Sequence, residues 1–304
     1  MKTTRNWHQK FLDFIDNPKN RFLVLLGPIH VVLFLVLLFP FLLMIFLSLS
    51  GWEPGKISWW LAQFNYGIGF INVFTDARFI YSFLRTFLIV APAVGVEFVF
   101  GLIGALLFSK TFRGKKLIAT FFLIPMFFMP VVVGYNFWMI FQPRGPLNYI
   151  VGLMVGRDFE LSWLSDRYAA IAALIIADVW QWTPFMFLLM TAGVLSLPEN
   201  PIMAAKVLGA SDWQIFRHIK LPMLKNIIVI ALIIRLMEAL KLFDMPFIMT
   251  GGGPGFHTET ISIYAFVVSI VSGRLGYGSS LALIILIVFL LIIAPSVRPI
   301  LRRR

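Results

Sequence analysis

Long apolar runs separated by short basic stretches decide what this chain can fold into. Residues 22–49 and 80–108 carry almost no charge, and each run is longer than the ~20 residues that a helix needs to cross a bilayer. Across the 304 residues, 60% are hydrophobic and only 13% are charged, which is about half the charged share of soluble domains. The sequence therefore predicts an all-α integral membrane protein.

The apolar runs predict about six transmembrane helices, at 22–49, 80–108, 117–141, 168–196, 225–249 and 277–297. We expect one membrane domain at 22–297, with a cytoplasmic N-terminal tail at 1–21 and a basic cytoplasmic C-terminus at 298–304. The tail has neither the apolar core nor the cleavage site of a signal peptide. The first span is therefore expected to act as an uncleaved insertion signal.

The distribution of Lys and Arg predicts the orientation of the chain. Seventeen of these residues lie in the N-terminal tail, in the connections after the second and fourth spans, and at the C-terminal end, whereas the three other connections and their margins hold seven. Because cytoplasmic loops carry the excess of positive charge, both termini are expected in the cytoplasm. The net charge of +12 is thus explained by topology, and no basic patch with interleaved aromatic residues indicates nucleic acid as a partner.

Residues 198–224 form the longest polar stretch on the predicted cytoplasmic side, and their pattern predicts a helix-turn-helix. Asn200 is expected to cap the first helix, with Pro201 in its first turn. Gly209 is expected to end that helix with a positive φ.

The second helix of this segment is predicted to begin with a capping box formed by Ser211 and Gln214. Ile215, Phe216 and Ile219 then share one face at helical spacing. We interpret this face as an exposed apolar docking surface, and the alternative is a face that lies along the lipid interface.

This segment also resembles a known family. Met203-Ala204-Ala205, three residues, Gly209, nine residues and then Ile219-Lys220-Leu221-Pro222 match the EAA loop of binding-protein-dependent ABC importers in spacing and in all but the first position. The resemblance implies that the segment is the coupling helix, which sits in a cleft of an ATPase subunit. The coupling residues would be Met203, Ala204, Ala205, Gly209, Ala210, Ile219, Leu221 and Pro222. The family usually has Glu in place of Met203, so a charge contact made there in relatives is not assumed here.

Three further motifs look like the maltose-type carbohydrate permeases. They are Phe112-Arg113-Gly114-Lys115, the stretch from Asp178 to Pro184, and the stretch from Thr250 to Gly255. The resemblance implies the transmembrane fold of a type I ABC importer and a heterodimer with a second homologous permease. It also implies two ABC ATPase subunits that bind ATP and Mg, an extracytoplasmic solute-binding protein and a carbohydrate-like solute, with no cofactor in this chain. The glycine-rich loop, with Gly251, Gly252, Gly253 and Pro254, would lie where the binding protein docks, and a flexible connection is the alternative.

Charged residues inside the apolar runs are candidates for a solute pathway, because a charge at mid-membrane must face protein or water. Arg235, Glu238, Lys241 and Asp244 recur every three residues in the fifth span, which predicts one stripe along a helix. This stripe is either an internal ion-pair ladder that joins this helix to its neighbours or part of the solute pathway. For the pathway we select Glu238, Lys241 and Asp244.

Asp178, Gln181 and Trp182 have the spacing of one helical face in the fourth span. An acceptor, an amide and a large ring suit a polyhydroxylated solute, whose hydroxyls need hydrogen-bond partners and whose C–H faces pack on aromatic rings. The resemblance supports the same stretch as part of the solute pocket. Glu97, an isolated carboxylate in the second span, is interpreted as hydrogen-bonded to a neighbouring helix.

The sequence gives little support to an enzyme. It contains no cysteine, no Walker A loop and no histidines at metal-ligand spacing, so ATP would have to be bound by a partner. Two alternatives stay open: a secondary transporter driven by an ion gradient, in which the intramembrane charges are relays, and a membrane-embedded enzyme or assembly factor. The solute is not identified, and disaccharides, polyols, oligosaccharides and glycerol phosphate are all candidates.

Overall fold

The protein is represented by a computed structural model that describes residues 7, 14, 18–65 and 67–301. These residues form helices joined by loops, and no strand occurs among them. The predicted all-α fold class is therefore confirmed.

Five helical runs are long. They are α2 (Pro18–Leu33), which continues through a π-helical turn (Phe34–Leu38) into α3 (Phe39–Ser48), then α5 (Ala77–Phe108), α9 (Arg167–Leu195), α12 (Leu221–Ala239) and α15 (Leu275–Leu301). The shorter α-helices are α4 (Ile68–Thr75), α6 (Lys115–Leu123), α7 (Pro130–Ile140), α8 (Pro146–Val155), α10 (Glu199–Val207), α11 (Asp212–Ile215), α13 (Asp244–Thr250) and α14 (Ile261–Phe266). The remaining turns are η2 (Trp59–Leu61), η3 (Ile124–Phe127), η4 (Phe216–Lys220) and η5 (Val267–Val271).

Four of the described helical segments are long and apolar enough to cross a membrane: Leu26–Ser48, Ala77–Phe108, Arg167–Leu195 and Leu275–Ala294. The third predicted span is bent by 96° between Lys115–Phe127 and Pro130–Ile140 and makes a fifth if the pair is one span. Proline has no N–H and its ring blocks the preceding turn, so Pro125 and Pro130 explain this break. The predicted number of six stays a prediction, because α12 is charged and ends at Ala239.

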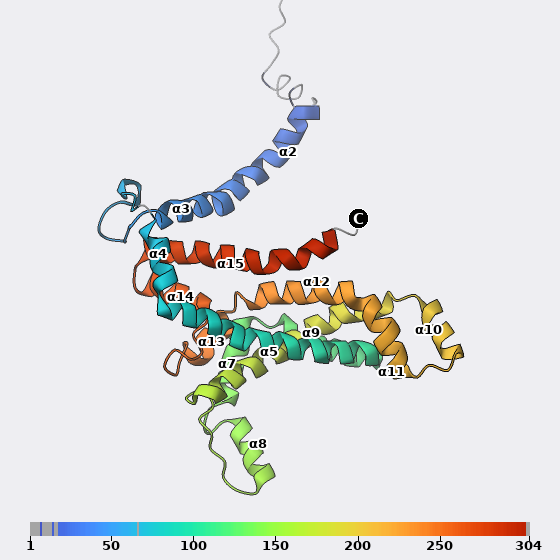
Figure 1. Cartoon of the computed structure of the whole chain (residues 1–304). Coiled ribbons are helices and arrows are strands. Elements are labelled where there is room, and N and C mark those ends of the chain that lie inside the picture. Colours follow the sequence, from blue (N-terminus) through green and yellow to red (C-terminus); the bar gives the residue numbers. More distant parts are fainter. Residues whose placement is uncertain (1–6, 8–13, 15–17, 66, 302–304) are drawn as a thin grey trace, which may run out of the picture.

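The centre of the molecule is the contact between α5 and α9, which run side by side (Figure 1). Gly101 permits this approach, because a Cβ there would lie 2.8 Å from the backbone nitrogen of Phe187. α12 packs on both helices, and Met186, Met190 and Leu224 are buried between the three. The connection formed by α10 and α11 lies at one end of this bundle, and the loop after α13 lies at the other.

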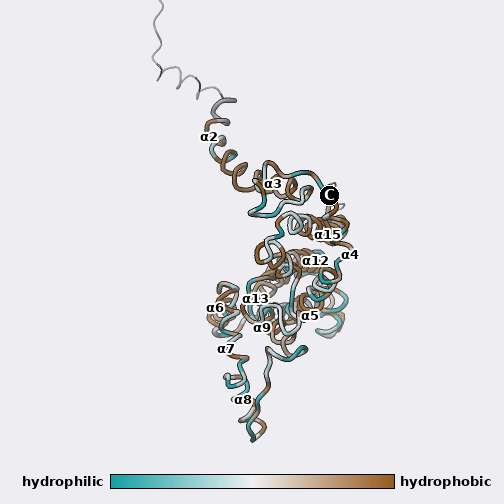
Figure 2. Tube along the Cα trace, turned by 90° about the vertical axis from the view of Figure 1, so that its left-hand side faces the viewer, coloured by the Kyte–Doolittle hydropathy of each residue, from teal (hydrophilic) through white to brown (hydrophobic). Residues whose placement is uncertain are grey.

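The first helical run extends away from the bundle (Figure 1). Its apolar side chains, such as Leu35 and Val36, are exposed, and Figure 2 shows the same apolar character along α3, α12 and α15. A surface of this kind is unfavourable in water and suits a lipid solvent.

Candidate functional site

Three helices bring one buried ion cluster together, formed by Glu97 of α5, Asp178 of α9 and Arg235 of α12. Arg235 Nε donates to Glu97 Oε2 at 2.7 Å, and Nη2 donates to Glu97 Oε1 at 2.9 Å and to Asp178 Oδ2 at 2.5 Å. Each of the three side chains is at most 2% exposed. We name these residues the buried triad.

Mutual pairing in the triad offsets the free-energy cost of burying these three charges. A buried charge is tolerated when it is paired and hydrogen-bonded, and the two bonds from Arg235 to Glu97 fix the plane of the guanidinium. The ring of Trp182 covers the same guanidinium, whose Cζ lies 4.9 Å from the ring centroid. Asp178 Oδ1 is buried and has no hydrogen-bond partner among the described residues, so this oxygen is a free acceptor.

The structure brings Asp178 and Trp182 together around Arg235 but gives Gln181 a different contact. Gln181 is buried, and its Nε2 donates to the carbonyl of Phe128 at 3.0 Å. Phe128 lies in the break between η3 and α7, so this bond ties the broken helix to α9.

The predicted charge stripe is not continuous, because two helices and the turn between them carry its residues instead of one helix. The alternative of ion pairs that join this helix to its neighbours agrees with the pairs of Arg235. Leu242 would be the helical acceptor for residue 246, but Pro246 has no N–H to donate. The carbonyl of Leu242 instead accepts from Thr260 Oγ1 at 2.9 Å. α12 ends at Ala239, and Asp244 begins a separate helix.

The four charges of the stripe consequently have different environments. Arg235 pairs with other helices, as described above, and makes no ion pair with Glu238 among the described residues. Glu238 and Lys241 form an exposed pair at 3.0 Å, with side chains 51% and 62% exposed. Asp244 is exposed as well, so the last three residues are accessible, whereas Arg235 is not.

Glu97 belongs to the site in the structure, but the sequence alone does not place it there. Its interpretation as a carboxylate bonded to a neighbouring helix agrees with the pair that it forms with Arg235. The signal that could have placed it in the site was the presence of a cation, Arg235, in another apolar run.

At one end of the bundle, α10 and α11 form the predicted helix-turn-helix. Gly209 has φ +82°, and the amide of Ala210 donates to the carbonyl of Ala205 at 3.0 Å, which closes the end of α10. The capping box of Ser211 and Gln214 is present in both directions. These local predictions are confirmed.

The predicted cap at Asn200 is wrong. α10 begins at Glu199, directly after Pro198, and Asn200 lies inside its first turn. Pro198 has an extended backbone at φ −65° and ψ 137° and takes the N-cap position, so the helix starts two residues earlier than predicted. The carboxylate of Glu199 then lies at the positive end of the helix dipole.

The predicted docking face of α11 is also wrong. Ile215 is 2% exposed, and Phe216 packs against the core formed by α5, α9 and α12. Other apolar side chains of this segment do reach solvent, and Val207 and Leu208 are the most exposed of them, at 87% and 86%. Sequence periodicity found the apolar face but could not show that the bundle covers it.

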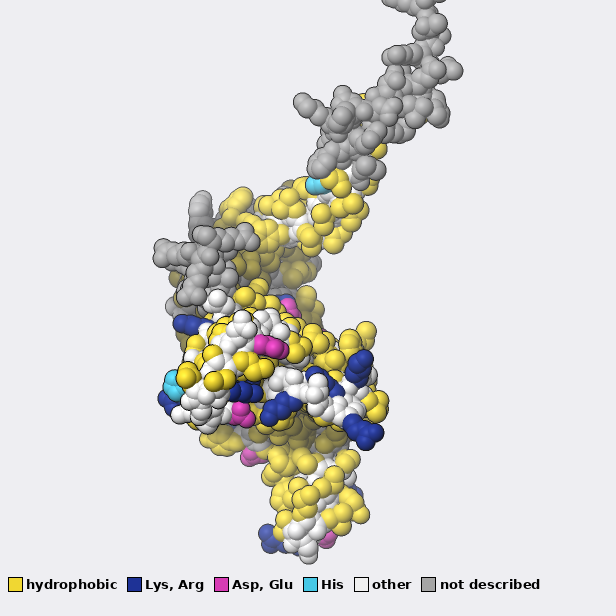
Figure 3. Space-filling view, turned by 90° about the vertical axis from the view of Figure 1, so that its right-hand side faces the viewer, with side chains coloured by type: hydrophobic (Ala, Val, Ile, Leu, Met, Phe, Trp, Pro, Cys, Tyr) yellow, Lys and Arg dark blue, Asp and Glu magenta, His cyan; other side chains and the backbone are white. Residues whose placement is uncertain are grey.

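The other coupling residues lie on the surface of this connection or at its edge. Met203, Ala204, Gly209 and Pro222 are exposed, and Ala205, Ala210, Ile219 and Leu221 are half-buried. Figure 3 shows Lys and Arg side chains across this end of the molecule, as expected for a surface that meets water and a partner rather than lipid.

At the opposite end, the glycine-rich loop has a defined shape. Thr258 Oγ1 donates to the carbonyl of Gly253 at 2.6 Å and lies 2.6 Å from the hydroxyl of Thr250. The amide of Thr258 donates to the carbonyl of Gly252 at 3.2 Å. Gly251 is exposed, Gly253 and Pro254 are half-buried, and Gly252 is buried.

Two polar clusters anchor this end to α5. Arg78 donates to both oxygens of Glu259, at 3.0 and 2.6 Å. Asp76, the N-cap of α5, accepts from the hydroxyls of Tyr264 and Tyr277. Partial burial acts to raise the pKa of Asp76, but the hydrogen bonds from the two tyrosines and from backbone amides outweigh it and hold this pKa below its usual value.

Residues 97–304 match the family described as binding-protein-dependent transport system inner membrane component. The chain belongs to this family of permeases. The matched region contains the buried triad, the α10–α11 connection and the glycine-rich loop. The permease is therefore a multi-pass inner-membrane transport component and not an enzyme.

Known relatives cover most of the permease. It is 34% identical over 276 residues to a probable ABC transporter permease of Sinorhizobium fredii, covering 89% of this chain and 86% of the relative. It is 33% identical over 223 residues to the trehalose/maltose transport system permease protein MalF of Thermococcus litoralis, covering 73% of this chain and 74% of the relative. The resemblance to the maltose-type permeases, which the sequence motifs indicate, is thus confirmed.

A solved structure shares the fold. A chain of a bacterial ABC transporter involved in the import of the acidic polysaccharide alginate superposes with a TM-score of 0.78 at 19% identity, covering 97% of the permease and 99% of that chain. The predicted fold class, the transmembrane domain of an ABC importer, is confirmed by this likeness.

Proposed function

We propose that the permease is one of two channel-forming subunits of an ATP-driven importer for a sugar, polyol or related polyhydroxylated solute. The observation that carries this proposal is the exposed α10–α11 connection, which presents the EAA pattern at one end of the bundle. The relatives named for trehalose and maltose transport support a carbohydrate solute. A separate pair of ATPase subunits would bind ATP and Mg and supply the energy.

The burial of Ile215 and the packing of Phe216 against the bundle core suggest how closure of the ATPases moves the membrane helices. α11, η4 and α12 follow one another without a loop from Asp212 to Ala239. A force on the exposed surface of α10 and α11 would therefore travel along one helical run, through Phe216, to the level of Arg235. Rearrangement of α12 against α5 and α9 would then close the solute cavity of the transporter on one side of the membrane and open it on the other.

The candidate solute pathway is the accessible polar surface next to the triad. Trp182 offers an aromatic ring, and Glu238, Lys241 and Asp244 offer exposed charges. Asp178 would take part through its free oxygen if the triad opens, and Gln181 would take part by positioning α9. A second, homologous permease would complete the cavity, and both termini would lie in the cytoplasm.

The glycine-rich loop would receive the solute-binding protein on the extracytoplasmic side. Hydrogen bonds such as that from Thr258 to Gly253 give the loop a fixed shape. Glu259, which follows the loop, is bonded to Arg78 of α5, and this contact would transmit docking of the binding protein to the bundle.

The test is purification of the chain from its native membrane in mild detergent, followed by mass spectrometry of the bound proteins. We expect a Walker-containing ATPase and a second permease of similar length. Repeated recovery of the chain alone, with uptake that survives deletion of the candidate ATPases, would instead favour an ion-coupled carrier.

A further inference from the structure

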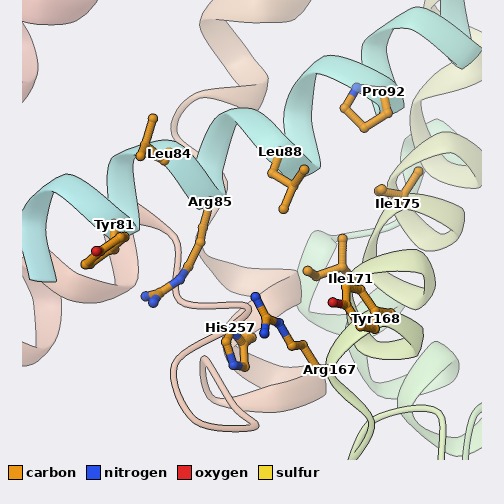
Figure 4. A pocket seen from close by; sticks show the side chains of 10 residues that line it. All are labelled: Tyr81, Leu84, Arg85, Leu88, Pro92, Arg167, Tyr168, Ile171, Ile175 and His257. Carbon is orange, nitrogen blue, oxygen red and sulfur yellow. The ribbon is translucent and has the colours of Figure 1, made fainter.

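A pocket of about 680 Å³ opens between α5 and α9, beside the glycine-rich loop. Figure 4 shows that its two ends differ in chemistry. Arg85, Arg167 and His257 gather near the loop, whereas Leu88, Pro92 and Ile175 lie further along the helices. The pocket is thus basic at one end and apolar at the other.

The basic end lacks a counter-ion from the protein. No Asp or Glu is among the residues that line the pocket, and Arg85 Nη1 is buried without a hydrogen-bond partner among the described residues. The nearby carboxylate of Glu259 is bonded to Arg78 and Ser82 instead. A buried guanidinium nitrogen without a partner is costly, so this end of the pocket fits an anionic group.

The apolar end decides what kind of anion fits. A sugar needs hydrogen-bond partners along its whole length, and Leu88, Pro92 and Ile175 offer none. Tyr81 and Tyr168 flank the basic end, and tyrosines are enriched at the depth of lipid headgroups. An amphiphile with one charged end matches both halves of the pocket.

We propose that this pocket binds an anionic phospholipid, with the phosphate at Arg85, Arg167 and His257 and an acyl chain along Leu88, Pro92 and Ile175. Arginine binds phosphate oxygens through two parallel N–H groups. The bound lipid would close the gap between α5 and α9 at this end. The proposal depends on the membrane location of the chain and not on which solute it carries.

Native mass spectrometry of the full chain in detergent tests this proposal. The chain is titrated with phosphatidylglycerol and, separately, with phosphatidylcholine of the same acyl chains. We expect phosphatidylglycerol to bind at least about tenfold more tightly. The Arg85→Gln, Arg167→Gln double variant should lose this preference, whereas Arg144→Gln, Arg157→Gln, in the exposed loops around α8, should keep it. If the double variant does not fold, Arg167→Gln alone, at an exposed position, should lower the preference severalfold.

Three results would overturn the proposal. The first is equal affinity of the unaltered chain for the two lipids, and the second is a preference that survives loss of the pocket arginines. The third is displacement of the lipid by millimolar inorganic phosphate or glucuronate, which would make the pocket a site for a soluble anion. As a further check, Leu88→Gln with Ile175→Gln should weaken binding of phosphatidylglycerol, and unchanged binding would contradict the acyl-chain placement.

Discussion

The guanidinium of Arg235 lies 2.5 Å from Asp178 Oδ2 and makes two further bonds to Glu97, so a single side chain of α12 joins α9 and α5. The same α12 continues from α11 through η4. The surface proposed to meet the ATPase and the buried triad are therefore two points on one helical run. A movement of this run relative to α5 and α9 would therefore act directly on the ion pairs of Arg235.

The first prediction concerns the stability of the triad. Arg235→Gln leaves two buried carboxylates without a cation and should cost about 3–5 kcal/mol in the free energy of unfolding. Glu97→Gln should cost less, because the pair of Arg235 with Asp178 remains. Thermal unfolding in detergent measures both. Lys241→Gln, which breaks only the exposed pair with Glu238, is the control and should change the free energy by about 0–1 kcal/mol. Equal melting temperatures for the Arg235 variant and the control would contradict the triad.

The partners in the triad could be predicted only in part. A charge in an apolar run needs a partner, and this much follows from the sequence for Glu97 and Arg235. The choice of partner does not, because spacing along the chain favoured Glu238. The packing of α12 on α5 and α9 decides that Arg235 pairs across helices. This packing depends on contacts between residues far apart in the sequence.

The α10–α11 connection shows the opposite case. Gly209, Ser211 and Gln214 act within a few residues of one another, so the turn and the cap were predictable. The packing of Phe216 was not, because the core that it contacts is formed by residues of α5, α9 and α12. Turns and caps, which depend on neighbouring residues, could thus be predicted from the sequence, whereas the contacts between helices could not.

The second prediction concerns the candidate pathway. Trp182→Ala removes the half-buried ring that covers Arg235 and should raise the KM for solute uptake severalfold, since an aromatic surface for the solute is lost. Trp180→Ala is a matched control, because Trp180 is an exposed ring on the same helix that stacks on Phe128 instead. Uptake kinetics in vesicles measure the effect. An unchanged KM in the Trp182 variant, at normal protein levels, would remove this residue from the pathway.

The third prediction uses the lowered pKa of Asp76. A carboxyl group whose pKa is lower in the folded than in the unfolded state stabilises the fold above the unfolded pKa, and this contribution is lost as the pH falls through the folded pKa. The melting temperature should therefore be insensitive to Asp76 titration between pH 7 and 5 and should fall below about pH 4. Asp76→Asn should flatten this acid limb. An identical acid limb in the variant would show that hydrogen bonds from Tyr264 and Tyr277 do not hold the ionised form.

The fourth prediction concerns Gly209. Its φ of +82° is unfavourable for a β-branched residue, although a Cβ there would meet nothing within 4 Å. Gly209→Val should therefore distort the turn between α10 and α11 and uncouple ATP hydrolysis from uptake while the chain stays in the membrane. Gly156→Val is the matched control, because Gly156 has φ +70° and equally open surroundings but lies after α8. Assays of ATPase activity and uptake in the assembled transporter separate the two. Coupled uptake at the normal rate in the Gly209 variant would argue that α10 and α11 do not transmit the motion of the ATPases.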